Sequence, residues 1–214
     1  MIWTDLGGLV LLNLAGAASP GPDIVLITRT AVRSRKHALA TTLGIQVGVL
    51  MWCTLTVVGA AALLNAFPTI LEFVQIIGGG WITWMGISML RSGWAERDNP
   101  PVDTDEAEAR LGSTRSSFWK GLITNLSNPK IVLFLAALVA PLLPPSPSVS
   151  TAVIVILALW LTSMALQVGI VLVVSTNAVR EKMLRAGPYI DMGAGLFFLV
   201  AGVSLIVRGI VGLL

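Results

Sequence analysis

Two charged side chains of opposite sign, Asp23 and Lys130, lie inside long apolar segments of the chain. A charged group within a membrane span costs at least ~2.5 kcal/mol on insertion scales, so such a group is expected to be paired or functional. Asp23 follows a proline at the point where a helix restarts, which is a favourable place for an anion. Lys130 occupies the same place in the second segment, where a cation opposes the helix dipole and needs a counter-charge.

Both charged residues follow motifs that interrupt helices. The interrupting residues are Pro20, Gly21 and Pro22 in the first segment and Pro129 in the second. Proline removes a backbone donor and clashes with the preceding turn, and glycine loosens the chain. Freed backbone groups are tolerated in a membrane only inside protein or along a watery cavity. Broken helices at matching positions indicate the binding site of a transporter; the alternative is a pair of structural kinks.

These features predict a small polar site near the middle of the membrane. The candidate binding residues are Asp23, Lys130, Asn125, Asn128 and Gln46. Asp23 would face a substrate ammonium group or carry a coupling proton, and Lys130 with the amides of the second break would face a carboxylate. The alternative is a permanent Asp23–Lys130 ion pair that only locks two parts of the chain together. Gln46 lies between two glycines that favour close helix packing, so we expect packing first and cavity lining second.

The composition is that of a membrane protein. Of the 214 residues, 55% are hydrophobic and 12% are charged, against roughly 25% charged in soluble domains. No charge occurs between Lys130 and Arg180, a run much longer than the ~20 residues that cross a bilayer. The apolar runs are continuous and do not alternate, which excludes a closed β-barrel. One cysteine and one histidine exclude disulfide and zinc frameworks, and we expect no metal site and no cofactor.

We expect six transmembrane helices in an all-α fold, at about 2–27, 38–64, 73–90, 121–140, 149–174 and 189–207. Twelve of the 14 lysines and arginines then fall in the three loops on one side. The positive-inside rule places these loops in the cytoplasm and both termini in the periplasm, for a multi-pass protein of the inner membrane. The membrane orientation accounts for the basic residues behind the net charge of +3, so nucleic acid is not expected as a partner.

The chain also matches itself. Residues 22–26 and 129–133 are identical at four of five positions, and the fifth is Asp23 against Lys130. Gly79 and Gly86 in the third span have the spacing of Gly195 and Gly202 in the sixth. We therefore expect a three-helix repeat at 1–90, a polar cytoplasmic linker at 91–120 and a second repeat at 121–214. Three spans per copy make the second copy inverted, as in many secondary transporters; the alternative is chance similarity between apolar segments.

Three motifs together resemble the LysE/RhtB family of amino-acid exporters. They are Ser19-Pro20-Gly21-Pro22-Asp23, Gly44-x3-Gly48 and Gly121-x3-Asn125-x2-Asn128-Pro129-Lys130. The resemblance covers nearly the whole chain, including its length and six spans. It implies efflux of amino acids driven by the proton motive force, with the two proline motifs embedded in the membrane. Protons and the lipid bilayer are then partners, and a second copy of the chain remains a candidate partner.

Other functions are less consistent with the sequence. A metal-cation exporter would need more Asp, Glu, His or Cys in the spans than this chain has. A membrane enzyme or a lipid scramblase remains an alternative, although the spans hold no nucleophile–base pair. A structural helper subunit is the residual class. No Gly-x4-Gly-Lys loop is present, so we expect that ATP does not drive the protein directly. Because the spans hold no nucleophile–base pair or acidic cluster, we expect that the protein is not an enzyme.

Overall fold

The computed structural model describes residues 3–18, 21–58, 68–98, 104–135, 148–179 and 186–213, and every element in these ranges is helical. The helices are α1 (Trp3–Ala18), α2 (Pro22–Arg33), α3 (Arg35–Val57), α5 (Pro68–Glu96), α6 (Thr104–Ala109), α7 (Thr114–Leu126), α8 (Pro129–Phe134), α9 (Val149–Val174) and α11 (Gly187–Leu213). The predicted all-α class is confirmed. Outside the described residues lie Ser19 and Pro20 of the first break, most of the turns expected at 65–68 and 141–150, and the basic residues Arg180, Lys182 and Arg185.

Among the described residues, three helices are long and apolar enough to cross a membrane, namely α3, α9 and α11. A fourth span is present if α1 and α2, which are bent by 62° relative to each other, are counted as one interrupted helix. The spans expected at 73–90 and 121–140 correspond to α5 and to α7 with α8. The second of these is interrupted before Pro129, and the part expected after Leu135 lies outside the described residues.

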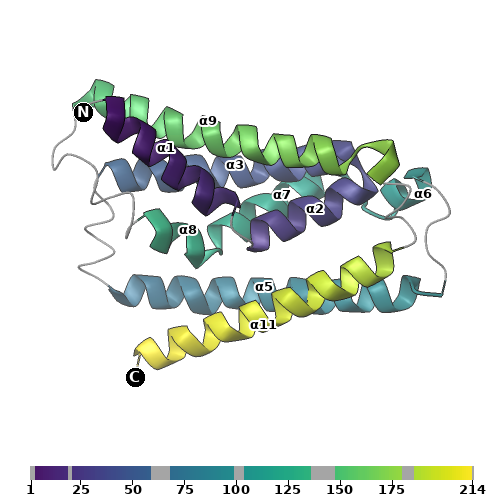
Figure 1. Ribbon diagram of the computed structural model, residues 1–214. Coiled ribbons are helices and arrows are strands. Elements are labelled where there is room, and N and C mark those ends of the chain that lie inside the picture. Colours follow the sequence, from purple (N-terminus) through teal and green to yellow (C-terminus); the bar gives the residue numbers. More distant parts are fainter. Residues whose placement is uncertain are drawn as a thin grey trace.

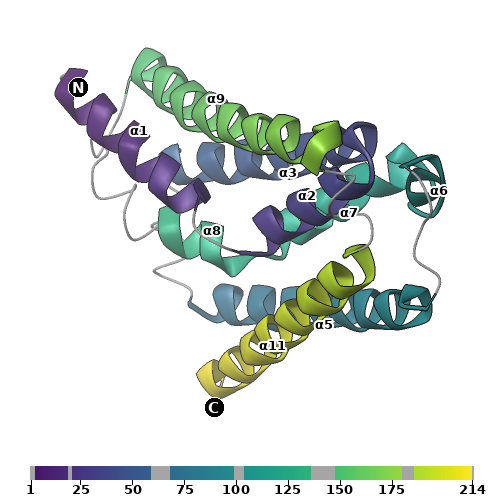
Figure 2. The same ribbon diagram turned by 45° about the vertical axis from the view of Figure 1, so that its right-hand side comes forward.

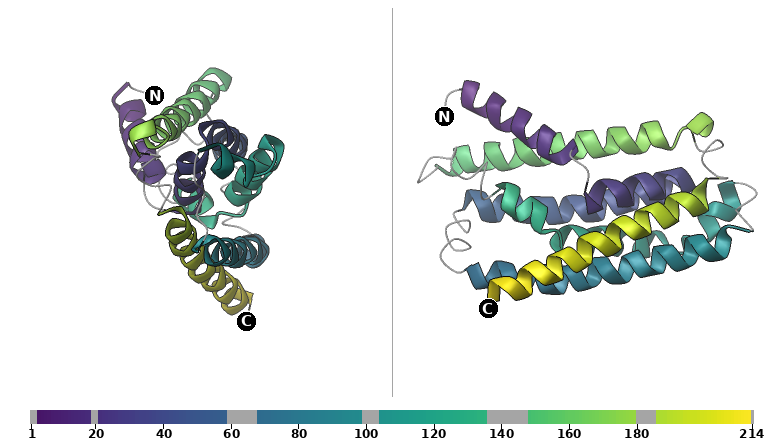
Figure 3. Two further views of the ribbon diagram at one scale, coloured as in Figure 1. Left: turned by 90° about the vertical axis from the view of Figure 1, so that its right-hand side faces the viewer. Right: turned by 60° about the horizontal axis from the view of Figure 1, so that its bottom comes forward.

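Two groups of helices lie side by side. The larger group contains α1, α2, α3, α7, α8 and α9, and the long helices α5 and α11 run antiparallel along one side of it (Figure 1, Figure 2). The end-on view in Figure 3 shows this pair to one side of the other helices. Both termini lie at one end of the molecule and α6 lies at the other (Figure 1). The outer faces expose large apolar side chains, such as Ile77 and Val200, as a lipid-facing surface requires.

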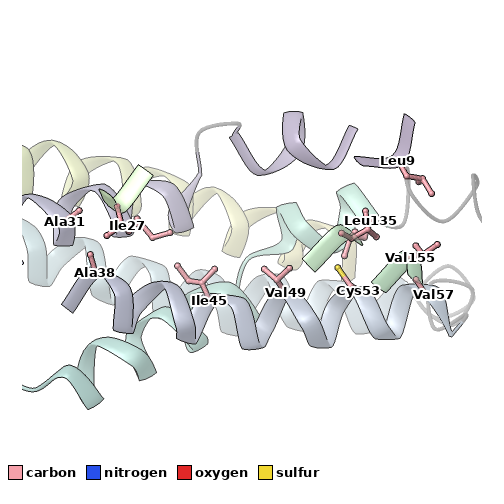
Figure 4. Packing of buried hydrophobic residues seen from close by; sticks show 12 residues of the cluster. Leu9, Ile27, Ala31, Ala38, Ile45, Val49, Cys53, Val57, Leu135 and Val155 are labelled. Atoms are coloured by element: carbon pink, nitrogen blue, oxygen red, sulfur yellow. The ribbon is translucent and has the colours of Figure 1, made fainter. Parts of the chain in front are cut away.

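Helix α2 is shared by two apolar cores. Ile27 belongs to a core between α1, α2, α3, α8 and α9, in which Figure 4 shows Cys53, Leu135 and Val155 gathered together. Leu26, the preceding residue, faces a second core with side chains of α5 and α11. Adjacent positions of one short helix thus contact both helix groups, so the position of α2 depends on both.

The α5–α11 contact is made by glycines that meet crosswise. A methyl group added at Gly86 would lie 2.8 Å from the carbonyl oxygen of Gly195, and one added at Gly195 would lie 2.8 Å from that of Gly86. Gly79 and Gly202 have the same relation at 2.7 Å in both directions. The two helices therefore touch backbone to backbone. In the sequence repeat, Gly79 corresponds to Gly195 and Gly86 corresponds to Gly202. In the structure the contacts are exchanged: Gly79 meets Gly202, and Gly86 meets Gly195. Such an exchange is typical of a self-complementary interface.

A buried ion cluster closes the α6 end of the molecule. Asp191 of α11, 1% exposed, accepts hydrogen bonds from Arg29 at 2.6 and 2.8 Å and from Arg33 at 2.6 Å. Arg33 also donates to Glu96 at the end of α5, at 2.9 Å. The cluster joins α2, α5 and α11. It also explains why α2 continues to Arg33, whereas the first span was expected to end near residue 27.

The crosswise glycines give a first prediction. Gly195→Ala should lower the free energy of unfolding by about 1–3 kcal/mol, because the new methyl group meets the backbone of α5. Gly193→Ala is the matched control, since a methyl group there has no heavy atom within 4 Å, and it should be neutral or stabilising by up to about 1 kcal/mol. Denaturant unfolding in detergent micelles measures both variants. Equal effects of the two substitutions would contradict backbone contact at Gly195.

The ion cluster gives a second prediction. Asp191→Asn leaves Arg29 and Arg33 in a buried site without their shared counter-charge, which should reduce stability by about 3 kcal/mol or more. The control is Asp98→Asn, which removes an exposed pair with Arg97 and should change stability by less than about 1 kcal/mol. The unfolding midpoints of both variants in the same detergent measure the difference. A loss at Asp191 no larger than that at Asp98 would contradict the structural role of the cluster.

Candidate functional site

Close contact between α3 and α7 brings the second break toward the centre of the larger helix group. A methyl group on Gly44 would collide with the carbonyl of Phe118, and one on Gly121 would collide with the carbonyl of Thr41. One turn further along both helices, Gly48 packs against the side chain of Asn125. Small residues at this spacing allow helix backbones to approach closely in a membrane. Asn125, fully buried, is thereby held beside the first break.

The first break places a carboxylate at a helix start. Gly21 is extended, and Pro22 is the first residue of α2, so that Asp23 lies in its first turn. Asn125 donates a hydrogen bond from Nδ2 to Asp23 Oδ2 at 2.8 Å. The other carboxylate oxygen, Oδ1, is buried and has no hydrogen-bond partner among the described residues. Because an unpaired buried acceptor is costly, one oxygen of Asp23 remains in need of a donor.

The second break places an ammonium group at the end of another helix. Asn128 caps α8 by accepting a hydrogen bond from the backbone N–H of Lys130 at 3.1 Å, and Pro129 is the first helical residue. Lys130 Nζ donates to the carbonyl oxygen of Gly16 at 3.1 Å. Gly16 lies in the last turn of α1, where carbonyls lack partners within the helix and a cation is favoured. The end of α1 thus supplies the negative partner that the sequence of α8 does not.

Each of the two charged residues forms a hydrogen bond with the helix that precedes the other break. Asp23, at the start of α2, binds the last turn of α7, and Lys130, at the start of α8, binds the last turn of α1. The ion pairs of the described residues do not include one between Asp23 and Lys130. The interrupted segments run in opposite directions, α1 and α2 toward the α6 end and α7 and α8 away from it (Figure 1). Gly78 of α5 lies against the carbonyl of Ser127 and covers the second break.

A cavity of about 50 Å³ lies between the two breaks and α9. Its polar lining residues are Asn13, Asp23, Asn128, Lys130, Ser163 and Gln167. The cavity has room for only a few water molecules and is much smaller than the ~300–1,000 Å³ of typical ligand sites. Both charged residues of the predicted site therefore line one small cavity.

Of the five residues predicted to bind substrate, three line this cavity and two lie behind it. Asp23, Asn128 and Lys130 contribute to the wall, whereas Asn125 supports Asp23 from α7. Gln46, 1% exposed, donates from Nε2 to Ser163 Oγ at 3.2 Å and to Gln167 Oε1 at 3.0 Å. Gln46 thus acts on the cavity through two side chains of α9.

Sequence reasoning did not place Asn13, Ser163 and Gln167 in the site. A signal for Gln167 was present, because Gln46-Val47-Gly48 recurs as Gln167-Val168-Gly169 in the second span of the second half. The two matching glutamines bind each other. No comparable signal marks Ser163, since a single serine in an apolar helix is common and its direction depends on how that helix is rotated.

The region that matches a known protein family includes almost the entire candidate site. A family model described as LysE type translocator matches residues 14–209, which include both breaks and every residue that lines the cavity except Asn13. The chain belongs to the LysE type translocator family. The resemblance expected from the motifs is confirmed, and the protein is a membrane transporter and not an enzyme.

Relatives within this family match nearly end to end. The chain is 27% identical over 200 residues to the "Threonine efflux protein" of Salmonella typhimurium, which covers 93% of this chain and 96% of that one. The "Threonine efflux protein" of Escherichia coli K12 is 26% identical with the same coverage. An "Uncharacterized membrane protein" of Haemophilus influenzae is 27% identical over 94% of this chain and 96% of its own length. No solved structure matches the chain.

The cavity of this LysE translocator can be probed through its single cysteine. Cys53 lines the cavity and is 1% exposed. A compound that enters the cavity, added at ten times its Kd, should slow the reaction of Cys53 with a small methanethiosulfonate reagent about tenfold, because it leaves about one site in ten open. The rate is measured by mass spectrometry of the protein in detergent or liposomes.

The control for this measurement is the double variant Cys53→Ala/Asp98→Cys, which moves the thiol to an exposed position. The same compound should not change its labelling rate. Protection of the thiol at both positions would show a general effect of the compound on the protein, and would contradict entry into the cavity.

Proposed function

We propose that this protein is a secondary active transporter that exports amino acids or similar small zwitterionic metabolites, by proton-coupled antiport with alternating access. The observation that carries the proposal is the pair of interrupted helices that present Asp23 and Lys130 to one cavity without an ion pair between them. A zwitterion carries an ammonium group and a carboxylate, whose charges are complementary to those of these two side chains. Two of the relatives are named threonine efflux proteins, which supports an amino acid as substrate.

In the proposed binding mode, each end of the zwitterion meets one break. The substrate ammonium group donates to Asp23 Oδ1, the carboxylate oxygen that has no partner in the described part of the chain. The substrate carboxylate binds Lys130, which then gives up its contact with Gly16, and Asn128 lies beside it. Charge-assisted hydrogen bonds of this kind are the strong ones in proteins.

The size of the cavity supports a cycle with at least two conformations. A space of about 50 Å³ is too small for an amino acid, so binding requires the cavity to widen. The breaks are suited to such movement, since α1 and α2 and also α7 and α8 are separate rigid pieces. In the proposed cycle the widened cavity opens first to the cytoplasm and then to the periplasm.

We propose that the coupling proton binds Asp23. A protonated carboxyl group no longer attracts an ammonium group, so a proton that arrives from the periplasm releases the amino acid there. The return of Asp23 with its proton to the cytoplasmic side completes an exchange of one solute for one proton. The isolated carboxylate oxygen at the cavity is the feature that supports this role.

The proposed architecture is six spans in two inverted repeats, 1–90 and 121–214, joined by the linker 91–120. Three sets of contacts between matching residues support it: the crosswise contacts of the α5 and α11 glycines, the contact between Gln46 and Gln167, and the crossed contacts of Asp23 and Lys130. The proposed location is the inner membrane with both termini in the periplasm. The end of α2 and the start of α3, which carry Arg33 and Arg35, lie at the α6 end, opposite the termini (Figure 1), and this supports the orientation.

Transport by purified protein tests the proposal. In proteoliposomes with an imposed pH gradient, the wild type should move threonine, and Asp23→Asn and Lys130→Met should each reduce the initial rate about tenfold or more through loss of a charged hydrogen bond. The matched controls are Asp98→Asn and Lys36→Met, which remove an exposed acid and an exposed base. Normal transport in both site variants would place the binding site elsewhere.

Counterflow without a pH gradient separates the two roles of Asp23. If Asp23 carries the proton alone, Asp23→Asn should lose gradient-driven transport and keep exchange of labelled for unlabelled threonine. If Asp23 also binds the substrate ammonium group, as proposed here, the variant should lose both activities. Retained gradient-driven transport in Asp23→Asn would contradict proton coupling at this residue.

A further inference from the structure

Two polar side chains of α9 face the cavity on the side opposite the proline breaks. Ser163 and Gln167 are 4% and 3% exposed and are one helical turn apart, so they lie on the same face of α9. An apolar membrane helix places polar side chains inside protein only where they are paired or functional. Neither residue contacts Asp23 or Lys130 in the hydrogen bonds of the described residues, so they form a separate polar part of the same cavity.

Gln46 orients the side chains of Ser163 and Gln167 through hydrogen bonds. Its Nε2 donates to Ser163 Oγ and to Gln167 Oε1, and Trp160 Nε1 in turn donates to the backbone oxygen of Gln46 at 3.0 Å. Since Gln167 Oε1 is occupied, its Nε2 remains as a donor, and the Ser163 hydroxyl hydrogen also remains. No acceptor among the described residues receives a hydrogen bond from either group.

One acceptor in this hydrogen-bond network of Gln46, Ser163 and Gln167 has no donor in the described part of the chain. Gln46 Oε1 is buried and has no hydrogen-bond partner among the described residues. The cluster of Gln46, Ser163 and Gln167 thus has hydrogen-bond donors at the cavity, on Ser163 and Gln167. It also has one acceptor for which the described residues supply no donor, the Oε1 atom of Gln46. A hydroxyl group both accepts and donates, so it can complete such a cluster whichever way the two glutamine amides are turned. A methyl group can do neither.

We propose that Ser163 and Gln167, oriented by Gln46, bind a hydroxyl group on the side chain of the substrate, so that the protein prefers hydroxy amino acids to aliphatic ones of equal size. The inference rests on the proposed function, in which Asp23 and Lys130 bind the ammonium and carboxylate groups that all amino acids share. Val49 and Cys53 of α3 line the same cavity and would contact the aliphatic part of a short side chain. Gln46 is a positioning residue here, because it acts through Ser163 and Gln167.

Threonine and valine test this inference, because they have the same shape and differ by a hydroxyl against a methyl group. The wild type in proteoliposomes should transport threonine at least about tenfold faster than valine at equal concentration, since a site that hydrogen-bonds a hydroxyl rejects the analogue without it. Ser163→Ala and Gln167→Leu should bring this ratio toward one, mainly by slowing threonine. Gln46→Leu should do the same, although Gln46 itself does not line the cavity.

Matched controls carry the same changes away from the cavity. Ser204→Ala alters an exposed serine of α11, and Gln75→Leu alters a glutamine of α5, so both should keep the wild-type ratio. The ratio is measured within each variant and is therefore independent of the amount of folded protein. It also responds to substrate recognition, which a merely structural role of Gln46 would leave unchanged.

The outcomes separate this inference from the proposed function. A wild type that moves amino acids but does not distinguish threonine from valine overturns the inference and leaves the function standing. Unchanged ratios in Ser163→Ala and Gln167→Leu, with transport intact, do the same. A wild type that moves no amino acid under a pH gradient or in counterflow overturns both.

Discussion

The lack of water inside a bilayer constrains the entire centre of this molecule. A helix interrupted within the membrane exposes backbone N–H and C=O groups that lipid cannot satisfy. Here each interruption is covered by protein: Asn128 caps the start of α8, Lys130 binds the end of α1, and Gly78 of α5 lies against the carbonyl of Ser127. The glycines of α3 bring Asn125 close enough to reach Asp23. The polar site is therefore a result of how the broken helices are satisfied.

The charged residue of each break binds a neutral group of the opposite break. A direct ion pair between Asp23 and Lys130 would use both charges and would cost a ligand the full separation energy. In the structure Asp23 accepts a hydrogen bond from the amide of Asn125, and Lys130 donates one to the carbonyl of Gly16. A zwitterion can replace such neutral partners with charged ones. In the proposed function this exchange strengthens both contacts, because a hydrogen bond between two charged groups is stronger than one between a charged and a neutral group.

The sequence predicted those parts of the site that depend on local backbone chemistry. Proline at 22 and 129 marks the starts of α2 and α8 because its ring fits only the first turn of a helix. The matching glycines of α5 and α11 were also recognisable from their spacing. Features that depend on helix rotation were not predicted. The sequence places Arg29 and Arg33 in a loop, whereas both lie on α2 because Asp191, 158 or more residues away, pairs with them.

The backbone contact between α5 and α11 also determines which parts of the molecule can rearrange. Packed helices slide past one another by exchanging side-chain rotamers, and a contact between glycine backbones has no rotamers to exchange. At Gly79, Gly86, Gly195 and Gly202 the two helices are therefore fixed to each other and can be displaced only as one body. They form a single rigid unit along one side of the molecule, and the ion cluster at Asp191 attaches α2 to one end of it.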